Sequence, residues 1–238
     1  MHQIGNYVFV DSPTLDYHPS TFRWWQNEID RCNLRAKENW FYVYNPRSGD
    51  LIVDIGAGKG EDTIAFSSAV GPAGRVISME AYPLTFHCLR LFCEINALDN
   101  VTPVHYAVMD KSGPVTMKTS EGWQGNSIEM SNKPGLATIS GITLDDFIAQ
   151  ENIHHIDFLK VNIEGAEGIA IGRMQETLRI TRTLCISCHD FLANEGAGEH
   201  FRTKALVQDA VKRAGFTLVS RDMDPRPYIA DQVNAFRE

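Results

Sequence analysis

The stretch at residues 51–63, LIVDIGAGKGEDT, constrains the fold of this chain more than any other. It begins with an apolar, largely β-branched run that only Asp54 interrupts, as in a parallel strand buried on both faces. Gly56, Gly58 and Gly60 follow at alternate positions and provide a tight turn that a ligand can approach closely. A helix is expected from Thr63. Strand, glycine turn and helix together predict the first unit of a nucleotide-binding α/β domain.

An acidic residue stands at the distance from this turn that ribose recognition requires. Residues 75–79, RVISM, predict the next strand, and Glu80 follows at its carboxyl end. A carboxylate about 20 residues past the glycine turn accepts hydrogen bonds from ribose hydroxyls. The alternative is an ordinary strand–turn–helix unit that carries a glutamate on its surface.

The glycine spacing differs from that of dinucleotide-binding proteins. Their fingerprint is G-x-G-x-x-G, whereas this chain has G-x-G-x-G preceded by Asp54. The pattern resembles the first motif of class I methyltransferases that use S-adenosylmethionine. In that resemblance Asp54 faces the side of the ligand that carries the sulfonium and the ammonium. Asp54, Glu61 and Asp62 would repel a pyrophosphate, so the local charge favours a cationic cofactor.

Length and charge limit the other function classes. The 238 residues suffice for one α/β domain with an N-terminal appendage, and the net charge is −8. A nucleic-acid-binding surface needs a broad excess of basic residues, so DNA and RNA are not expected as partners. No stretch approaches 18 apolar residues, and no membrane span is expected.

The cysteines indicate reduced thiols. There are five of them, an odd number, and the N-terminus MHQIGNYVFV lacks the features of a secretory signal. We therefore expect a cytoplasmic protein. Cys185 and Cys188 have C-x-x-C spacing, but no second such pair accompanies them, and the segment reads as a buried strand. A zinc or redox role is the minor alternative.

Predicted strands alternate with predicted helices through most of the chain. This predicts a Rossmann-like, doubly wound and mostly parallel sheet over residues 50–238. A β-hairpin insertion is expected from residues 115–117 and 126–128, with its tip at residues 121–125. Residues 1–49 form a separate N-terminal segment that contains an aromatic-rich helix at residues 21–40. That helix either caps a substrate pocket or packs against the sheet, and the two alternatives are compatible.

Polar residues follow the predicted strands at the edge where ligands bind in open α/β sheets. These residues are Asp54, Glu80, Asn162, Glu164, His189 and Asp190. Methyl transfer to a hydroxyl needs alignment of donor and acceptor and a general base. His189 and Glu164 are the candidates for that base. The structural alternatives are a capping or core histidine, and a glutamate that stabilises a helix N-terminus.

Four segments in order, DIGAGKG, SMEAYP, TLDDF and DFLKVNIEGAE, resemble the FkbM family of methyltransferases. The resemblance covers roughly residues 51–189. It implies a Rossmann-like fold, S-adenosylmethionine as donor, and mainly O-methylation of natural products or sugars. The family usually has Asn at the position of Gly58 and Asp at the position of Asn162. An amide serves neither as a base nor as an anionic metal ligand. Asn162 therefore makes Glu164 and His189 the stronger candidates for the base.

We therefore predict a methyltransferase that uses S-adenosylmethionine and acts on a hydroxyl of a small molecule. The alternatives are a non-catalytic protein that binds S-adenosylmethionine and, with less support, a nicotinamide-dependent oxidoreductase. The candidate catalytic residues are His189 and Glu164, and no metal ligand is assigned. The candidate cofactor contacts are Asp54, Gly56, Ala57, Gly58, Gly60, Thr63, Glu80, Ala81, Tyr82, Ala107 and Asn162. The oligomeric state is left open, with a homo-oligomer under consideration.

Overall fold

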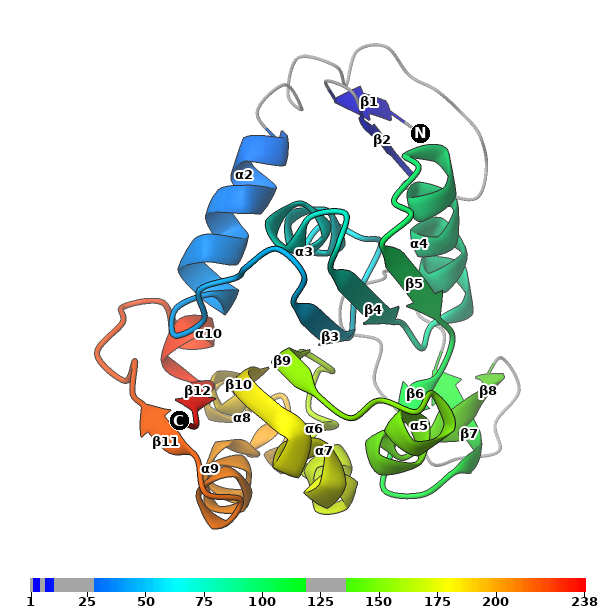
Figure 1. Cartoon of the computed structure of the whole chain (residues 1–238). Coiled ribbons are helices and arrows are strands. Elements are labelled where there is room, and N and C mark those ends of the chain that lie inside the picture. Colours follow the sequence, from blue (N-terminus) through cyan, green and yellow to red (C-terminus); the bar gives the residue numbers. More distant parts are fainter. Residues whose placement is uncertain (1, 5–6, 11–27, 119–135) are drawn as a thin grey trace.

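The computed structural model describes residues 2–4, 7–10, 28–118 and 136–238. A seven-stranded sheet forms its centre, with the strand order β11-β12-β10-β9-β3-β4-β5 (Figure 1). Its strands are β3 (Leu51–Ile55), β4 (Arg75–Met79), β5 (Val101–Val104), β9 (Ile156–Val161), β10 (Thr181–Ser187), β11 (Thr217–Val219) and β12 (Gln232–Phe236). Neighbouring strands from β10 to β5 are parallel, and β12 runs antiparallel to both β10 and β11. The predicted fold class is confirmed.

The first predicted strand lies at the centre of this sheet. β3 pairs in parallel with β4 on one side and β9 on the other, with Val53 opposite Ile77 and Leu159. Successive side chains of β3 belong to different cores, since Ile52 packs on one face and Val53 on the other. Burial on both faces explains why the strand is a continuous apolar run apart from Asp54.

Helices cover both faces of the sheet (Figure 1). The first face carries α2 (Glu28–Arg35), the π-helix η2 (Ala36–Trp40), α3 (Thr63–Val70) and α4 (Pro83–Ile95). The second carries α5 (Leu144–Gln150), α6 (Glu167–Ala170), η3 (Ile171–Arg173), α7 (Gln175–Ile180) and α9 (Lys204–Arg213). Shorter segments complete the described helices: α8 (Asp190–Asn194), η4 (Glu199–Phe201) and α10 (Pro227–Ala230). None of these helices has the length and apolar composition of a membrane span.

A small second sheet stands beside β5 and differs from the predicted insertion. It has the order β6-β8-β7, with β6 (Ala107–Val108), β7 (Gly113–Lys118) and β8 (Leu136–Ile142). β7 pairs antiparallel with β8, whereas the hairpin was predicted between residues 115–117 and 126–128. The predicted second strand and tip lie outside the described residues. Gly141 permits the close pairing, because a Cβ there would come within 2.5 Å of Val115.

The N-terminal segment contributes to the core. β1 (His2–Ile4) and β2 (Tyr7–Phe9) form a two-stranded hairpin, and the backbone of Val8 bonds the side chain of Asn96 at the end of α4. Tyr44 stacks on Phe158 of β9 with ring centroids 4.6 Å apart. Residues 21–27 of the predicted aromatic-rich helix lie outside the described residues. The remainder forms α2 and η2, and Trp40 at its end is buried in the same core as strand residues Ile52 and Phe158, as one of the two alternatives predicted. The division at residue 50 stays a prediction.

Candidate functional site

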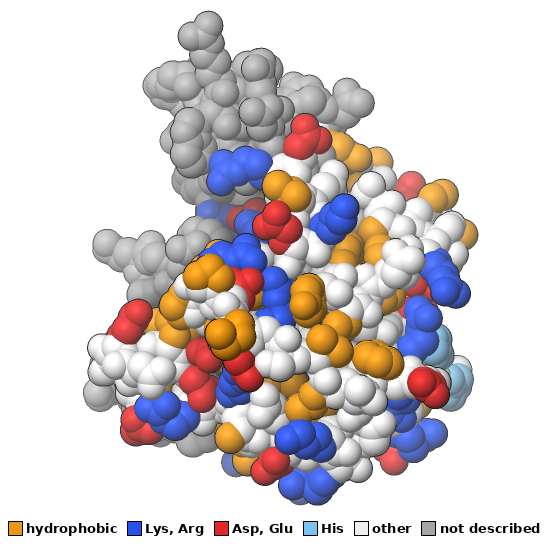
Figure 2. All heavy atoms as spheres, turned by 90° about the vertical axis from the view of Figure 1, so that its left-hand side faces the viewer, with side chains coloured by type: hydrophobic (Ala, Val, Ile, Leu, Met, Phe, Trp, Pro, Cys, Tyr) orange, Lys and Arg blue, Asp and Glu red, His pale blue; other side chains and the backbone are white. Residues whose placement is uncertain are grey.

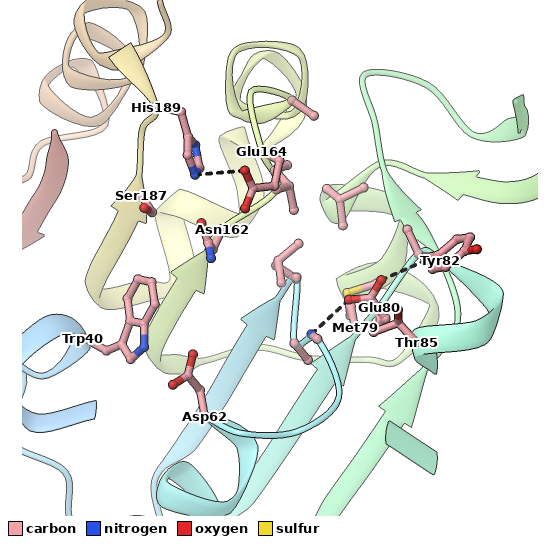
Figure 3. Close-up of a pocket in the computed structure, with 18 of the residues that line it drawn as sticks. Trp40, Asp62, Met79, Glu80, Tyr82, Thr85, Asn162, Glu164, Ser187 and His189 are labelled. Carbon is pink, nitrogen blue, oxygen red and sulfur yellow. Dashed lines mark hydrogen bonds and ion pairs between the residues drawn. The ribbon is translucent and has the colours of Figure 1, made fainter. Parts of the chain in front are cut away.

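A cavity of about 670 Å³ opens at the carboxyl ends of β3, β4, β9 and β10, a volume typical of sites for small ligands and cofactors. Ten of the thirteen predicted site residues line it: Gly56, Ala57, Gly58, Glu80, Ala81, Tyr82, Ala107, Asn162, Glu164 and His189. Figure 3 shows Glu80 and Tyr82 on one side of the cavity, and Asn162, Glu164 and His189 on another. The topology thus brings together residues that are up to 133 positions apart in the sequence (Gly56 to His189).

Glu80 is held across the glycine turn by two backbone amides. Its Oε2 accepts a hydrogen bond from the Gly58 N–H at 3.0 Å, and its Oε1 accepts one from the Tyr82 N–H at 2.8 Å (Figure 3). Each carboxylate oxygen has a second lone pair for a further donor. Burial raises the pKa of Glu80 to about 7, against the opposing effect of these hydrogen bonds. A fixed carboxylate with two vacant acceptor positions suits a vicinal diol.

Asp54 does not lie on the cavity wall, contrary to the expectation that it faces the ligand. Its carboxylate is completely buried and forms an ion pair with Lys160 Nζ at 2.8 Å. The two residues are direct partners in the β3–β9 register, so the sheet itself places the charges together. The Thr63 hydroxyl also reaches Asp54, and neither Thr63 nor Gly60 lines the cavity.

Gly56 is required by the packing of the turn. Its φ is +76°, and a Cβ would lie 1.9 Å from the carbonyl oxygen of Asn162. A side chain there would therefore separate the ends of β3 and β9 before it reached any ligand. Gly58 has φ +61°, a left-handed conformation that Asn tolerates better than most residues. The backbone thus fits the Asn that the FkbM resemblance places at this position.

His189 follows β10 and lies between two carboxylates. Its Nε2 is 3.6 Å from Glu164 Oε2, and its Nδ1 is 3.2 Å from Glu167 Oε1 (Figure 3 draws the first contact). Burial lowers the pKa of His189, but the close contact with Glu167 and the charges of Glu167, Glu164 and Asp231 outweigh it. The net effect raises the pKa above the usual 6.5.

Glu167 was not among the predicted site residues, although it stands in the same motif as Glu164. It is 1% exposed, and its two oxygens accept hydrogen bonds from the N–H groups of Ile163 and Gly165, each at 3.0 Å. These bonds fix the loop in which Glu164 has a φ of +53°. Glu167 therefore orients both the loop and the His189 ring. The second acid of the segment EGAE, placed where the next helix was expected to begin, was the available signal in the sequence.

Several cavity residues were not among the predicted site residues, although the helix at residues 21–40 had been considered as a cap and Asp62 as part of the local charge. They include Arg35, Asn39, Trp40, Asp62, Ser187, Phe191, Tyr228 and Gln232. The aromatic content of residues 21–40 was the available signal for Trp40. Its indole Nε1 is buried and has no hydrogen-bond partner among the described residues.

The residues considered for a metal or redox role are Asn162 and the C-x-x-C pair Cys185 and Cys188. No group of three or more His, Cys, Asp or Glu side chains in the described part of the chain is arranged to hold a metal ion. Asn162 lines the cavity, and its buried Oδ1 has no hydrogen-bond partner within the described ranges. Cys185 and Cys188 are both buried, and burial raises the pKa of Cys185 to about 12, which disfavours its thiolate.

Comparison with known proteins gives the fold and the family. The structure is similar to a candidate rRNA methylase of Clostridium thermocellum (TM-score 0.51, 14% identity, 89% of this chain and 97% of that chain). It is also similar to a candidate O-methyltransferase of Klebsiella pneumoniae (TM-score 0.50, 11% identity, 94% and 83%). A candidate caffeoyl-CoA O-methyltransferase of Staphylococcus aureus is comparable (TM-score 0.50, 11% identity, 95% and 87%). No curated protein matches the sequence. The methyltransferase FkbM domain matches residues 54–218, more than half of the chain, and the protein therefore belongs to the FkbM family of S-adenosylmethionine-dependent methyltransferases.

Proposed function

We propose that the protein methylates a hydroxyl of an uncharged small molecule, with His189 as the general base. The observation that carries this proposal is the position of His189. The ring is 5% exposed, lines the cavity, and is held between the carboxylates of Glu164 and Glu167. Contact between Glu167 and Nδ1 favours the tautomer with the proton on Nδ1, which leaves Nε2 able to accept a proton.

The residues of the cavity fit the donor. Glu80 offers two vacant acceptor positions to the ribose hydroxyls, beside the turn formed by Gly56 and Gly58. Met79 and Thr85 line the cavity near Glu80 (Figure 3), and the apolar side chain of Met79 offers a surface for the adenine. Asn162 lies between Glu80 and His189 and presents a side-chain amide to the reacting region. The orphaned oxygen of this amide supports a ligand contact at that point.

Methyl transfer to a hydroxyl requires no covalent bond between the protein and either substrate. S-adenosylmethionine, when bound, supplies an electrophilic methyl group whose bond to sulfur breaks as the acceptor oxygen attacks, the electron pair remaining on sulfur. His189 removes the proton from the attacking hydroxyl through Nε2, and Glu164 and Glu167 stabilise the imidazolium that results. Glu164, 36% exposed at its side chain, also orients the acceptor. His189 and Glu164 lie in the segments that follow β10 and β9, where Glu167 contacts the ring of one and the loop of the other, so alignment contributes to the rate.

The charges around the cavity favour an acceptor without negative charge. Four acidic side chains line it, Glu61, Asp62, Glu80 and Glu164. Among the described lining residues Arg35 is the only arginine or lysine, and its ion pair with Asp62 balances its charge, so the acids of this wall outnumber its cations. A phosphate would meet repulsion here.

The same argument disfavours a polyanionic acceptor such as the RNA named for one structural neighbour. On the face that carries α2 and α10, Lys and Arg side chains are interspersed with acidic and apolar ones (Figure 2). The overall charge of −8 acts in the same direction.

The proposed function is tested by methyl transfer from radiolabelled S-adenosylmethionine to matched pairs of acceptors. Each pair consists of a neutral polyhydroxylated compound and its phosphorylated derivative, and a third set carries amines in place of hydroxyls. We expect transfer only to neutral hydroxyl compounds. Transfer to the phosphorylated members, to amines or to RNA would contradict the proposed acceptor class.

Donor affinity is expected to depend on pH through Glu80. Ribose hydroxyls donate to the ionised carboxylate, and the pKa of Glu80 is about 7, so donor binding must compete with protonation at lower pH. We expect the affinity for S-adenosylhomocysteine to fall roughly 10-fold from pH 8 to pH 6, following the ionised fraction of this carboxyl. Isothermal titration calorimetry measures it.

Glu80→Gln is the matched variant for this experiment. The amide retains the size of the side chain but has no charge to titrate, so the affinity should be lower at pH 8 and nearly constant down to pH 6. A wild-type affinity that stays constant over this range would contradict the role of Glu80. A variant that retains the wild-type pH dependence would assign the titration to another group.

A further inference from the structure

We propose that Trp40, Arg35 and Asp62 form a receptor for the zwitterionic amino-acid end of S-adenosylmethionine. The inference rests on the donor position proposed above, in which Glu80 holds the ribose. It assigns to the N-terminal segment a donor-binding role that the glycine turn does not fill. The carboxylate of the donor would bind the Trp40 indole N–H and the Arg35 guanidinium, and its ammonium would bind Asp62.

The indole of Trp40 is an unused donor in a fixed ring. The side chain is 6% exposed and lines the cavity, while Nε1 has no hydrogen-bond partner among the described residues. Lys160 Nζ lies 5.1 Å from the ring centroid, and the ring packs in the core with Tyr44 and Phe66. A buried donor without a partner is costly, so a ligand acceptor at this position would remove a penalty that the free protein carries.

Arg35 and Asp62 form the complementary ion pair beside this ring. Arg35 Nε and Nη2 both lie 2.9 Å from Asp62 Oδ1. The guanidinium has five N–H groups and the carboxylate has four lone pairs, so both retain capacity for a ligand. A fixed Arg–Asp pair presents a positive and a negative group side by side, as the ammonium and carboxylate of an amino acid do.

The direction of the donor follows from the two sides of the glycine turn. Figure 3 shows Trp40 and Asp62 on one side of the cavity and Glu80, Met79 and Thr85 on the other, with the indole nitrogen on the side of the ring nearer Asp62. The side near Glu80 is the more apolar and suits the adenine. The amino-acid end must then extend toward Trp40.

The acidic cavity wall explains why the donor carboxylate needs specific binding groups. The other acids on the wall, among them Glu61 and Glu164, repel the carboxylate of the donor. Arg35, the only arginine or lysine in the described lining, supplies the positive charge that offsets this repulsion. The π-helix η2 begins directly after Arg35, and its last two residues, Asn39 and Trp40, line the cavity. π-Helical turns often occur at functional sites.

Two ligands that differ only at the amino-acid end test the proposal. S-adenosylhomocysteine carries the zwitterion, whereas 5′-methylthioadenosine has the same nucleoside thioether without it. Binding of each to the full chain is measured by calorimetry for wild type, Trp40→Phe and Arg35→Gln. Phenylalanine keeps an aromatic ring over Lys160, but the ring is smaller than an indole and has no N–H. Arg75→Gln, which removes an exposed arginine paired with Glu151, is the control.

We expect Trp40→Phe and Arg35→Gln each to weaken S-adenosylhomocysteine roughly 10- to 100-fold, the range for a hydrogen bond to a charged group. Affinity for 5′-methylthioadenosine should remain within about twofold, which also shows that the variants fold. Equal losses for both ligands, or no loss for either, would overturn the proposal. A wild-type protein that binds neither compound would instead contradict the donor site proposed above.

Discussion

Replacing His189 with alanine is expected to lower kcat by roughly 10²- to 10⁴-fold while the affinity for S-adenosylhomocysteine stays nearly unchanged. The loss is that of a general base, and the ring does not contact the residues that hold the ribose and the amino-acid end in the proposed donor position. Turnover with labelled donor and calorimetric binding measure the two quantities separately. The assignment of His189 as the base needs a second test, because removal of its buried ring also changes the packing.

The pH profile of kcat supplies that test. His189 accepts a proton only when it is neutral, so the rate should rise with pH through its pKa. That pKa lies above 6.5, because Glu167, Glu164 and Asp231 outweigh the effect of burial. Glu164→Gln removes one of these charges and should shift the rising limb to lower pH. Glu151→Gln, a change to an exposed glutamate that pairs with Arg75, should leave the limb in place.

Two outcomes would contradict the assignment. Normal turnover by His189→Ala, with loss of turnover in Glu164→Gln, would make Glu164 the base. Normal turnover by both variants would mean that alignment alone drives transfer, or that the acceptor needs no base.

The sequence predicted the parts of the site that follow from local pattern and strand order. Alternation of strands and helices predicts a parallel sheet, and parallel strands end at one edge, so Glu80, Asn162, Glu164 and His189 were expected along that edge, where they line one cavity. The FkbM resemblance supplied the family, and the domain match over residues 54–218 confirms it.

The remaining parts depend on tertiary contacts that have no local signature. Nothing near Asp54 in the sequence indicates that Lys160, 106 positions later, lies beside it in the β3–β9 register. When Lys160 is not known to be its partner, an acid directly before the glycine turn is interpreted as a ligand contact, as Asp54 was. Trp40 and Arg35 precede the domain match altogether, and only the fold brings them to the cavity opposite Glu80.

The ion pair between Asp54 and Lys160 leads to the second large prediction. Lys160→Met should lower the free energy of unfolding by about 3–5 kcal/mol, because it leaves a buried carboxylate without its countercharge. Both side chains are at most 1% exposed, so water cannot replace the ammonium. The variant also loses the 2.7 Å hydrogen bond from Nζ to the Gly56 carbonyl. Urea unfolding followed by circular dichroism measures the change.

Asp54→Leu combined with Lys160→Met separates the two losses. The double variant removes both charges and replaces them with apolar groups, so it should be more stable than Lys160→Met alone. If the double variant is as unstable as the sum of the single ones, the missing bond to Gly56 and altered packing explain the effect, and the ion pair does not.

The pH dependence of stability provides an independent test of the ion pair between Asp54 and Lys160. Burial raises the pKa of Asp54 above its usual 3.8, and Lys160 opposes that effect. Without Lys160 the folded pKa rises further, and between pH 3.8 and this folded pKa the native state binds one proton more than the unfolded state. Stability should therefore fall as pH rises, by about 1.4 kcal/mol per unit, over a window that extends to higher pH in Lys160→Met than in wild type. Equal windows in the two proteins would mean that Lys160 does not hold Asp54 ionised.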